Sequence, residues 1–505
     1  MLTALLCFLL LAAATSANDS SLRSIAWYAG WQTGFPLSQV SWSKYTQLTY
    51  AFATTTPDVN TLFLADSDKQ LLPQFVQMAH QNNVKAALSI GGWGGSQFFS
   101  TNVGSAENRT AFVKTVTTLA QNYSLDGLDF DWEFPGSNSK SIGCNTANSN
   151  DTSNFLSFLQ ELRQDSVGSK LILSAATYVL PWNDTTGTPL TDVSPFGQVL
   201  DFIAIMNYDV YNTLSNHAGP NSPLSDSCAP SSDQIGSAMS AVKAWTDAKM
   251  PASQILLGIA SYGHSFVASE SDVIQSASSS NITNIYPPFN LSSEHLGDIW
   301  DGIGGVDFCG NFSGPSGVYN YWGLVDEGYI NVDGTPQSGI AYVFDNCSQT
   351  PFVYNKSNQT FISFDNPESF ALKGAFIKNS GLGGFSMWDA AGDLNDTLID
   401  AIRTSCHDLG FLVSVIEVYP FFFSLLLPPL SNQSSPVNSI PLSALPTLPS
   451  LSFTESAIGT SNTQPSSPSS STSHSSASSI IIGSPITIMT MILTSGVVIL
   501  VSLIL

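Results

Sequence analysis

The chain is 505 residues long, and its 43% of hydrophobic and 11% of aromatic residues are enough for a large buried core. Its formal net charge of −23 at pH 7 argues against binding of nucleic acid or of an anionic membrane through a basic surface. The aromatic content suits stacking on sugar rings.

Residues 1–17 read as a secretory signal peptide. An apolar run from Leu5 to Ala14 precedes the small residues Thr15, Ser16 and Ala17, which suit a cleavage site. Acceptor sites for N-glycosylation agree with export, and they include Asn108, Asn183, Asn281, Asn311 and Asn395. We therefore expect a secreted or cell-surface glycoprotein.

Eight short β-prone segments follow one another along the chain, with segments of helical period between most of them. Strand alternating with helix about eight times is typical of an α/β fold of the (β/α)8 TIM-barrel type. A doubly wound sheet would need a Gly-rich phosphate turn after its first strand, and this sequence has none there. The expected strands are Ser24–Trp31, Gln47–Ala53, Val84–Ile90, Gly127–Trp132, Leu171–Thr177, Phe202–Tyr208, Ile255–Ser261 and Gly384–Trp388. The expected helices include Leu71–Gln81, Ala111–Asn122, Asn154–Gln164, Ile235–Ala248 and Pro367–Lys378.

The fourth expected strand carries an unusual group of acids. Asp129, Asp131 and Glu133 are two residues apart, so in a strand they project from one face while the large apolar residues between them project from the other. Acids crowded on one face resist ionising together, and at least one should keep its proton near neutral pH, as acid catalysis of a glycosidic bond requires. A solvated acidic loop would not carry Phe and Trp between the acids, and a metal site would want a His close by.

A long stretch separates the seventh and eighth strands. The 266–363 segment has its own aromatic residues and Gly-rich turns, and a structureless loop of that length is improbable in a compact domain. We expect a small inserted α+β domain that walls one side of a cleft, rather than a disordered insertion.

The C-terminal part changes in character after the catalytic body, which we place at 22–406. An apolar, Pro-broken segment at 410–429 is too short to span a membrane, and its residue types also fit an intron retained in the gene model. Within 407–479, the residues from 431 onward are rich in Ser, Thr and Pro and predict a disordered, glycosylated stalk. The apolar tail 480–505 has no Lys or Arg after it, which favours a cleaved glycosylphosphatidylinositol-anchor signal over a retained membrane helix.

Five cysteines remain after the predicted signal peptide. An oxidising compartment permits disulfides, and an odd number leaves at least one cysteine without a partner in the chain. The spacing matches no zinc pattern. We expect the pairs Cys144–Cys228 and Cys309–Cys347, with Cys406 left over.

Further motifs lie at the ends of other expected strands. Gly91, Gly92 and Trp93 follow the third strand, and the two glycines allow the backbone to pack closely. The segment from Met206 to Asp209 ends the sixth strand, and Tyr262 and Trp388 lie at the ends of the seventh and eighth. All of these positions belong to the end of a barrel at which active sites are found.

Together these motifs resemble glycoside hydrolase family 18, the chitinases, and within it the fungal secreted members. The resemblance runs from about residue 24 to 401, and Asp126, Asp129, Asp131 and Glu133 match the complete D-x-x-D-x-D-x-E signature of the family. The insertion after the seventh strand is similar to the extra domain of the deep-cleft subgroup. The resemblance implies a retaining mechanism in which the 2-acetamido group of the substrate attacks the anomeric carbon and forms an oxazolinium ion. It implies chitin or chitooligosaccharides as partners, and neither a metal nor an organic cofactor.

The resemblance also assigns roles to individual residues. Glu133 is similar to the general acid, Asp131 to the residue that aligns the acetamido group, and Asp129 to the neighbour that shares a proton with it. Tyr208 is expected to bond the acetyl carbonyl, Asp209 to line the same pocket, and Trp388 to form the floor under the distorted sugar. Asp126, on the other face of the strand, is expected to order the strand entry, and Gly91 and Gly92 are expected to be structural. Further substrate-binding candidates are Tyr28, Phe52, Trp93, Met206 and Tyr262, with Tyr178 and Trp182 as additional aromatic candidates.

Without the family pattern, the core of the sixth strand is the better reading for Met206 and Tyr208, and Trp388 reads equally well as barrel filler. One departure concerns His264, which stands where many relatives carry Arg, and a titratable side chain there would change a substrate contact or the pH profile.

We expect an endo- or exo-chitinase that acts as a monomer and reaches a membrane only through its C-terminal tail or a lipid anchor. Three alternatives remain open: an endo-β-N-acetylglucosaminidase acting on N-glycans, a non-catalytic chitin-binding lectin, and a transglycosylase.

Overall fold

The computed structural model describes residues 22–136, 144–234, 236–275, 281–293, 296–307 and 309–407, and the backbone of two strands near the C-terminus. The segments 1–17, 410–429 and 431–479 lie outside the described residues. The two C-terminal strands, β17 (Thr487–Thr494) and β18 (Val497–Ile504), pair antiparallel and belong to a unit separate from the body at 22–407. Within the described ranges, no helix is both long and apolar enough to cross a membrane.

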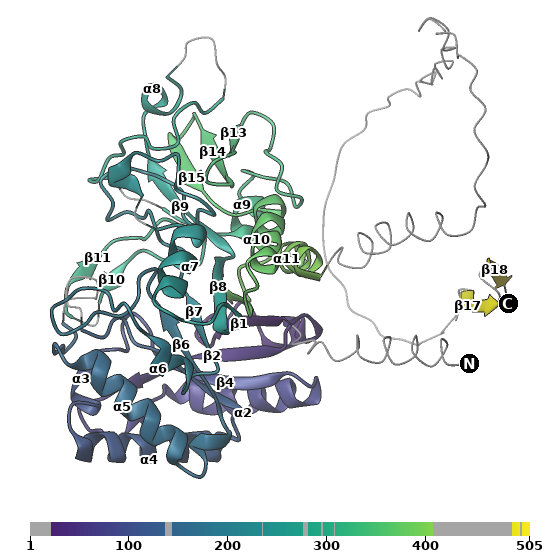
Figure 1. The fold of residues 1–505 in the computed structure, drawn as a ribbon. Coiled ribbons are helices and arrows are strands. Elements are labelled where there is room, and N and C mark those ends of the chain that lie inside the picture. The colour runs from purple at the N-terminus through teal and green to yellow at the C-terminus, as the bar shows by residue number, and fades with distance from the viewer. Residues whose placement is uncertain are drawn as a thin grey trace, which may run out of the picture. The chain divides into compact units, whose positions relative to one another are not determined.

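The body is a closed parallel barrel, which confirms the predicted fold (Figure 1). β1 pairs with both β2 and β16, so the sheet closes on itself in the order β1-β16-β8-β7-β6-β5-β4-β2. Each expected strand segment overlaps one observed strand, and the ends differ by up to three residues. These strands are β1 (Arg23–Ala29), β2 (Gln47–Thr55), β4 (Lys85–Gly91), β5 (Gly127–Asp131), β6 (Ile172–Thr177), β7 (Phe202–Ile205), β8 (Ile255–Ala260) and β16 (Gly384–Trp388); the short β3 (Leu62–Phe63) pairs antiparallel with β2.

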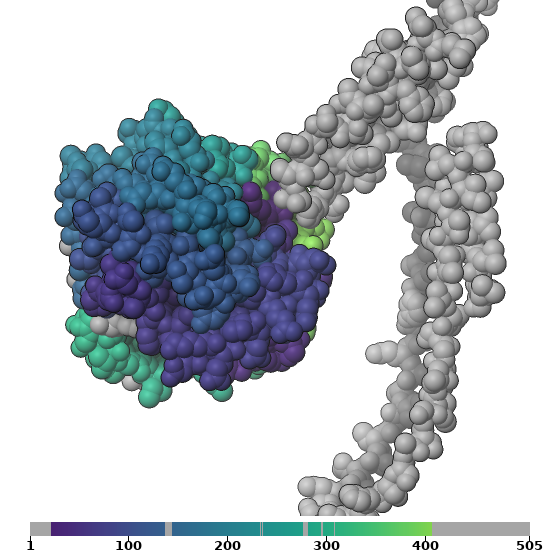
Figure 2. Space-filling view, turned by 90° about the horizontal axis from the view of Figure 1, so that it is seen from below, coloured from purple at the N-terminus to yellow at the C-terminus, as the bar shows by residue number. Residues whose placement is uncertain are grey.

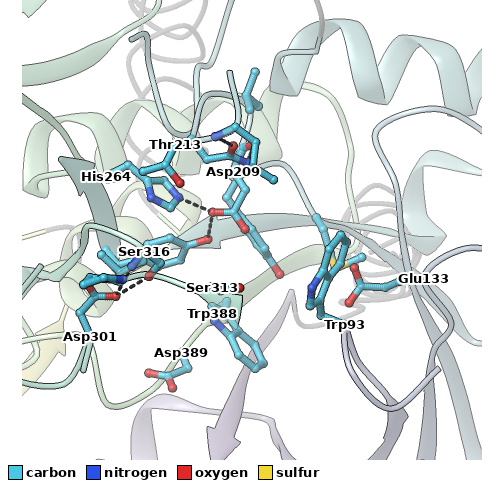
Figure 3. Close-up of a pocket in the computed structure, with 18 of the residues that line it drawn as sticks. Trp93, Glu133, Asp209, Thr213, His264, Asp301, Ser313, Ser316, Trp388 and Asp389 are labelled. Atoms are coloured by element: carbon cyan, nitrogen blue, oxygen red, sulfur yellow. Dashed lines mark hydrogen bonds and ion pairs between the residues drawn. The ribbon is translucent and has the colours of Figure 1, made fainter. Parts of the chain in front are cut away.

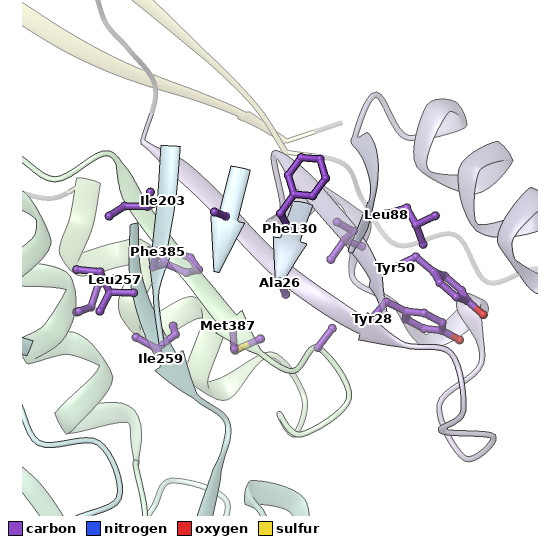
Figure 4. Close-up of a cluster of buried hydrophobic side chains, with 14 of the residues drawn as sticks. Ala26, Tyr28, Tyr50, Leu88, Phe130, Ile203, Leu257, Ile259, Phe385 and Met387 are labelled. Atoms are coloured by element: carbon purple, nitrogen blue, oxygen red, sulfur yellow. The ribbon is translucent and has the colours of Figure 1, made fainter. Parts of the chain in front are cut away.

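Helices cover the outside of the barrel, and the main core lies between them and the strands (Figure 4). Phe130 of β5 shows the arrangement, because its ring meets the rings of Phe155 and Phe158 at 6.0 and 5.4 Å. The longer helices are α2 (Asp66–Gln81), α4 (Ala106–Tyr123), α5 (Asp151–Gln164), α7 (Ala238–Asp247), α10 (Pro367–Asn379) and α11 (Thr397–His407). The short ones are α3 (Phe99–Asn102), α6 (Ser194–Gly197), α8 (Glu270–Val273) and α9 (Tyr321–Asp326).

The long stretch between β8 and β16 folds into an α+β insertion, which begins at Tyr262. Its antiparallel sheet has the strand order β12-β9-β15-β14-β13, and the insertion also forms a separate two-stranded hairpin, β10–β11. Phe266, Phe352 and Phe361 form part of a core that belongs to the insertion. The strands are β9 (Tyr262–Val267), β10 (Gly305–Val306), β11 (Phe312–Ser313), β12 (Val318–Asn320), β13 (Ala341–Asp345), β14 (Thr350–Asn355) and β15 (Thr360–Ser363).

The disulfide pairing that we expected is wrong. The structure joins Cys144 to Cys309 and Cys228 to Cys347, with Cα–Cα distances of 5.5 and 6.1 Å, and Cys406 is buried as a free thiol. Pairing depends on which cysteines the fold brings to this separation. The insertion folds back toward the connections of earlier strands, so both bonds span more than a hundred residues, at separations of 165 and 119.

Candidate active site

The acids of β5 lie at the carboxyl end of the strand, inside the barrel. Asp129 is buried, and its Oδ1 accepts a 2.6 Å hydrogen bond from the Ser174 hydroxyl of the neighbouring β6. Its Oδ2 accepts hydrogen bonds from the hydroxyl of Ser89 at 2.8 Å and the indole N–H of Trp27 at 3.2 Å. Burial raises the pKa of Asp129, and the three hydrogen bonds oppose that rise by stabilising the carboxylate.

Asp131 and Glu133 follow at alternate positions toward the opening of the barrel. Burial, together with the charges of Glu133 and Asp129, raises the pKa of Asp131 well above its usual range. Burial and then the charge of Asp209 raise the pKa of Glu133 to about 8. Glu133 faces a pocket, and its carboxyl therefore keeps a proton near neutral pH while remaining accessible to a ligand.

Backbone contacts hold this end of β5 in place. Gly92 N–H donates to the carbonyl of Asp131 at 2.8 Å, and Ser96 Oγ donates to the same carbonyl at 2.9 Å while accepting from the Glu133 N–H at 3.1 Å. Gly91 has φ +112°, and a Cβ there would lie 2.1 Å from the Asp131 carbonyl oxygen. Glycine is therefore required at position 91 for β4 to approach β5 so closely.

The pocket has a volume of about 1090 Å³ and opens at the carboxyl ends of the strands (Figure 3). Glu133 shares its lining with residues at or after the ends of five other barrel strands and with several residues of the insertion that follows β8. Sequence-predicted residues on the wall are Trp93, Tyr178, Met206, Tyr208, Asp209, Tyr262 and Trp388. The structure thus brings most of the expected substrate-binding set together around one acid.

Trp388 rests on a stack of aromatic rings. Its ring lies 5.7 Å from that of Phe52, with an interplanar angle of 18°, and 6.3 Å from that of Trp31. The indole of Trp27 lies 5.8 Å away on another side. Rings fixed in this way present a flat apolar surface at low cost in side-chain entropy, as stacking on a sugar requires.

A hydrogen-bonded group of three side chains lines the wall beyond Tyr208. Oδ1 of Asp209 lies 2.7 Å from the hydroxyl of Tyr262 and 2.7 Å from Nε2 of His264 (Figure 3). Burial raises the pKa of Asp209, but the hydrogen bond and charge of His264 and the hydrogen bond of Tyr262 outweigh it, so the net shift is downward. Asp209 also has a left-handed backbone, with φ 56°, and Asn221 accepts its N–H. Such backbone strain is typical of functional positions.

Tyr208 lies next to these carboxylates with its phenol in the pocket. Burial first, and then the charges of Asp131, Asp209, Glu133 and Asp129, raise its pKa well above 10. The hydroxyl therefore stays neutral over the working pH range and can donate a hydrogen bond to a ligand.

Three expected aromatic ligands are absent from the pocket wall. Tyr28 is buried against Phe35 and Phe75, because β1 directs Trp27 into the barrel and its neighbour outward to the helices. Phe52 supports Trp388 from the core side instead of lining the pocket. Trp182 packs 4.2 Å from the ring of Phe196 in the core.

Asp126 lies at the opposite end of β5, away from the pocket. Its Oδ2 bonds to Ala86 N–H at 2.9 Å and to Nε2 of His80 at 2.8 Å, and its Oδ1 bonds to Lys85 at 2.9 Å. These contacts tie β5 to the start of β4 and lower the pKa of Asp126 in spite of its partial burial. This placement fits the predicted role of Asp126 in ordering the entry to β5.

Sequence reasoning missed several residues of the pocket. Trp31, at the end of the first expected strand, is 53% exposed and could have been found from that position. Asp389 lines the pocket beside Trp388, and burial, opposed by backbone hydrogen bonds, raises its pKa to about 6. The insertion contributes 312–316, for which no local pattern exists. In the described part of the chain, no group of three or more His, Cys, Asp or Glu side chains is arranged to hold a metal ion.

Comparisons with known proteins point in one direction. Residues 23–393 match the model of the glycosyl hydrolases family 18. A protein of Moniliophthora roreri named a chitinase-like effector is 48% identical over 402 residues, covering 79% of this chain and 96% of that protein. A protein of the same name from Moniliophthora perniciosa is 47% identical over 391 residues, covering 77% and 88%. The crystal structure of a chitinase from Rhizomucor miehei superposes with a TM-score of 0.68 at 33% identity, covering 76% of this chain and 100% of that one.

Proposed function

Because the chain belongs to family 18 of the glycosyl hydrolases, we propose that it hydrolyses β-1,4-N-acetylglucosaminide bonds of chitin with retention of configuration. The observation that carries this proposal is the placement of Glu133. Its carboxyl faces the pocket next to an aromatic floor, and its pKa of about 8 keeps it protonated at neutral pH. An acid in that state can donate its proton to a glycosidic oxygen as the bond breaks.

The nucleophile in this proposal belongs to the substrate. A second carboxylate at the anomeric carbon is unnecessary when the 2-acetamido oxygen attacks it and forms an oxazolinium ion. Asp131 ends β5 two residues before Glu133, and the charge of Glu133 acts on it, so Asp131 can accept the acetamido N–H and balance the positive charge as it develops. Tyr208 supplies a neutral hydroxyl that can hold the acetyl carbonyl in line for attack.

Asp129 acts on the acetamido group only through Asp131. Its carboxylate accepts three hydrogen bonds from Ser174, Ser89 and Trp27, and it raises the pKa of Asp131. As positive charge grows on the acetamido group, a proton can shift from Asp131 toward Asp129 and leave Asp131 ionised where the charge is needed.

A second candidate function is chitin binding without cleavage. The names of the two Moniliophthora relatives, chitinase-like effectors, favour it, and the exposed aromatic side chains Trp31 and Trp93 suit capture of an oligosaccharide. Against it stands the complete acidic signature, since a binding protein has no need of a protonated Glu133.

The two functions are separated by comparing the full chain with Glu133→Gln and Asp126→Asn. The substrates are oligomers of N-acetylglucosamine and a glycoprotein bearing N-glycans, and proton NMR identifies the first anomer released. We expect β-anomeric products from the oligomers, a loss of about 10²–10⁴-fold in kcat for Glu133→Gln, and near-normal turnover for Asp126→Asn, whose side chain lies outside the pocket.

Binding of oligomers without release of new reducing ends would support the second candidate. Cleavage of the glycoprotein alone would identify an N-glycan endoglycosidase, and products longer than the starting oligomer would identify transglycosylation. Full activity of Glu133→Gln would contradict the proposed mechanism.

A further inference from the structure

The Cys144–Cys309 disulfide joins two elements from opposite sides of the barrel mouth. Cys309 belongs to the insertion, which lies in the chain between β8 and β16, and Cys144 belongs to the connection that follows β5. In the closed sheet, two strands separate β8 from β5 by way of β7 and β6, and three separate β16 from β5 by way of β1, β2 and β4. Figure 1 shows the β10–β11 hairpin beside the barrel, away from the large sheet of the insertion.

The Cys144 end of this bond is attached firmly to the catalytic strand. Asn145 Nδ2 donates a 3.0 Å hydrogen bond to the carbonyl of Glu133. Thr146 donates through both its N–H and its hydroxyl to the carbonyl of Gln97, at 2.9 and 2.6 Å. The two residues after Cys144 therefore bond to the backbone of Glu133 and to the connection that follows β4.

The Cys309 end belongs to a hairpin that apolar packing does not hold. β10 and β11 have two residues each, and a hairpin that short is marginal by itself. Ile303, Val306 and Phe312 are 90%, 71% and 75% exposed, so they gain little from burial. Asp301 fixes the base of the hairpin by accepting from the N–H groups of Ser316 and Gly317 at 3.1 and 2.9 Å. The disulfide near the tip is the second attachment.

Between these two attachments the insertion follows the rim of the pocket. Trp300 lies against the loop after β1, where a Cβ on Gly34 would come within 2.5 Å of its ring. In Figure 2, surface of the insertion in teal green adjoins purple surface of the N-terminal residues. The 312–316 segment then lines the same pocket as Glu133 and Trp93. Figure 3 draws Ser313 and Ser316 of this segment around the opening that holds Trp388.

We propose that the Cys144–Cys309 bond closes the rim of the pocket, so that a polymer of N-acetylglucosamine enters by a chain end and internal segments of long chains are excluded. A chain lying across the barrel needs a gap in the rim on two sides. On the arc from β16 through β1, β2 and β4 to β5, one covalently joined segment spans the rim and closes that gap. The inference rests on the proposed function, because it concerns how the same substrate reaches Glu133.

The test opens the rim and leaves the site intact. The double variant Cys144→Ser/Cys309→Ser is compared with the unaltered chain and with Cys228→Ser/Cys347→Ser. The second disulfide is a matched control, because it also ties the insertion to a barrel connection and neither of its cysteines lines the pocket. Soluble glycol chitin is the polymeric substrate, and the fall in viscosity is measured against the number of reducing ends released.

We expect the unaltered chain and the control variant to release ends with little loss of viscosity. With the Cys144→Ser/Cys309→Ser variant, the viscosity of the substrate solution should fall several-fold faster per bond cleaved. Turnover of a short chromogenic glycoside should be unchanged, and the melting temperature should be similar to that of the control variant. A rapid fall in viscosity with the unaltered chain, or equal changes in both double variants, would overturn the inference.

A binding measurement tests the rim independently of hydrolysis. In the Glu133→Gln background, calorimetry compares a hexamer of N-acetylglucosamine with the same hexamer carrying a bulky group at each end. We expect the protein with the Cys144–Cys309 bond to bind the free hexamer and reject the blocked one. The Cys144→Ser/Cys309→Ser variant should bind both. If neither the unaltered protein nor its variants cleave chitin but the free and blocked hexamers bind differently, the proposed hydrolysis fails while the rim inference stands. Equal binding of both ligands to the closed rim would refute the inference.

Discussion

Nε2 of His264 lies 2.7 Å from Oδ1 of Asp209, in the wall of the pocket that holds Glu133. Burial, and after it the charge of Asp209, raises the pKa of Glu133. His264 therefore acts on the acid through Asp209, since its hydrogen bond and charge help to keep that carboxylate ionised. Glu133, which follows β5, and His264 of β9 are thus coupled through the carboxylate of Asp209.

Substituting Asp209 by Asn should shift the pH profile toward acid. Removing the negative charge lowers the pKa of Glu133 from about 8, so the general acid loses its proton at a lower pH and the alkaline limb of kcat moves down. The profile of kcat against pH on a soluble oligomer measures this shift. Tyr262→Phe is the control, because it keeps the charge of Asp209 and should leave the limb nearly in place. An unmoved limb in Asp209→Asn would show that the two carboxyls are not coupled.

The pH dependence of stability should reveal the same buried acid. The pKa of Glu133 rises from 4.5 in the unfolded chain to about 8 in the fold, so its stabilising contribution is complete below 4.5 and is lost as the pH rises through 8. The melting temperature of Glu133→Gln minus that of the parent should therefore be higher at pH 8 than at pH 5, by roughly a few degrees. Calorimetry at the two pH values measures it.

The Asp126→Asn variant is a control whose stability, relative to the parent, should change with pH in the opposite direction. The folded pKa of Asp126 is lowered, so its contribution is present above the unfolded pKa and disappears as the pH falls through the folded one. That variant should be destabilised at pH 8 and approach the parent in acid. A pH-independent difference for both variants would contradict the assigned pKa shifts.

Loss of the aromatic floor should weaken binding. Trp388→Ala removes a ring that rests on Phe52 and Trp31, so we expect kcat/KM on oligomers to fall roughly tenfold or more. Trp388→Phe keeps a smaller ring and should lose less. Calorimetric Kd values for an oligomer, measured in the Glu133→Gln background, separate binding from chemistry. An affinity of Trp388→Ala equal to that of the parent would mean that the ring contributes to packing and not to binding.

A buried ion pair away from the pocket should control stability without affecting catalysis. Lys373 and Asp365 are fully buried with Nζ and Oδ1 2.7 Å apart. Burial lowers the pKa of Lys373, and the neighbouring carboxylate opposes that shift. Lys373→Met leaves the carboxylate uncompensated and should lower the free energy of unfolding by about 3–5 kcal/mol, as measured by urea titration.

Replacing both members of this pair should restore much of the loss. The double variant Lys373→Met/Asp365→Leu removes both charges from the interior, so no unpaired carboxylate remains there. Activity on oligomers should be unchanged in all of these variants. A Lys373→Met variant as stable as the parent would show that the pair adds nothing.

The local parts of this protein were predictable from sequence because their signals are local. A strand buried on both faces reads as a continuous apolar run, and eight such runs alternating with helical periods specify a barrel without any knowledge of contacts. The acids of β5 were also readable, since the period of two residues in a strand determines that Asp129, Asp131 and Glu133 share a face.

Tyr28 and Phe52 were predicted on the wrong side of their strands because the local pattern there is ambiguous. In a fully buried strand such as β1, both faces are apolar, so the sequence cannot say that Trp27 faces the barrel interior and Tyr28 the helices. Only the pairing with the neighbouring strands decides which of the two residues faces the barrel interior. Phe52 was misplaced for the same reason.

The acidic signature, the barrel and the order of its strands were determined by the sequence alone, because each depends on the spacing of neighbouring residues. The tertiary structure decided which cysteines pair, which aromatic rings reach the pocket and how the insertion closes its rim. The aromatic placement depends on how neighbouring strands pair, and the other two features depend on the return of a segment more than a hundred residues distant to the connection after β5. Contacts of that kind follow from how whole elements pack, and no local period encodes them.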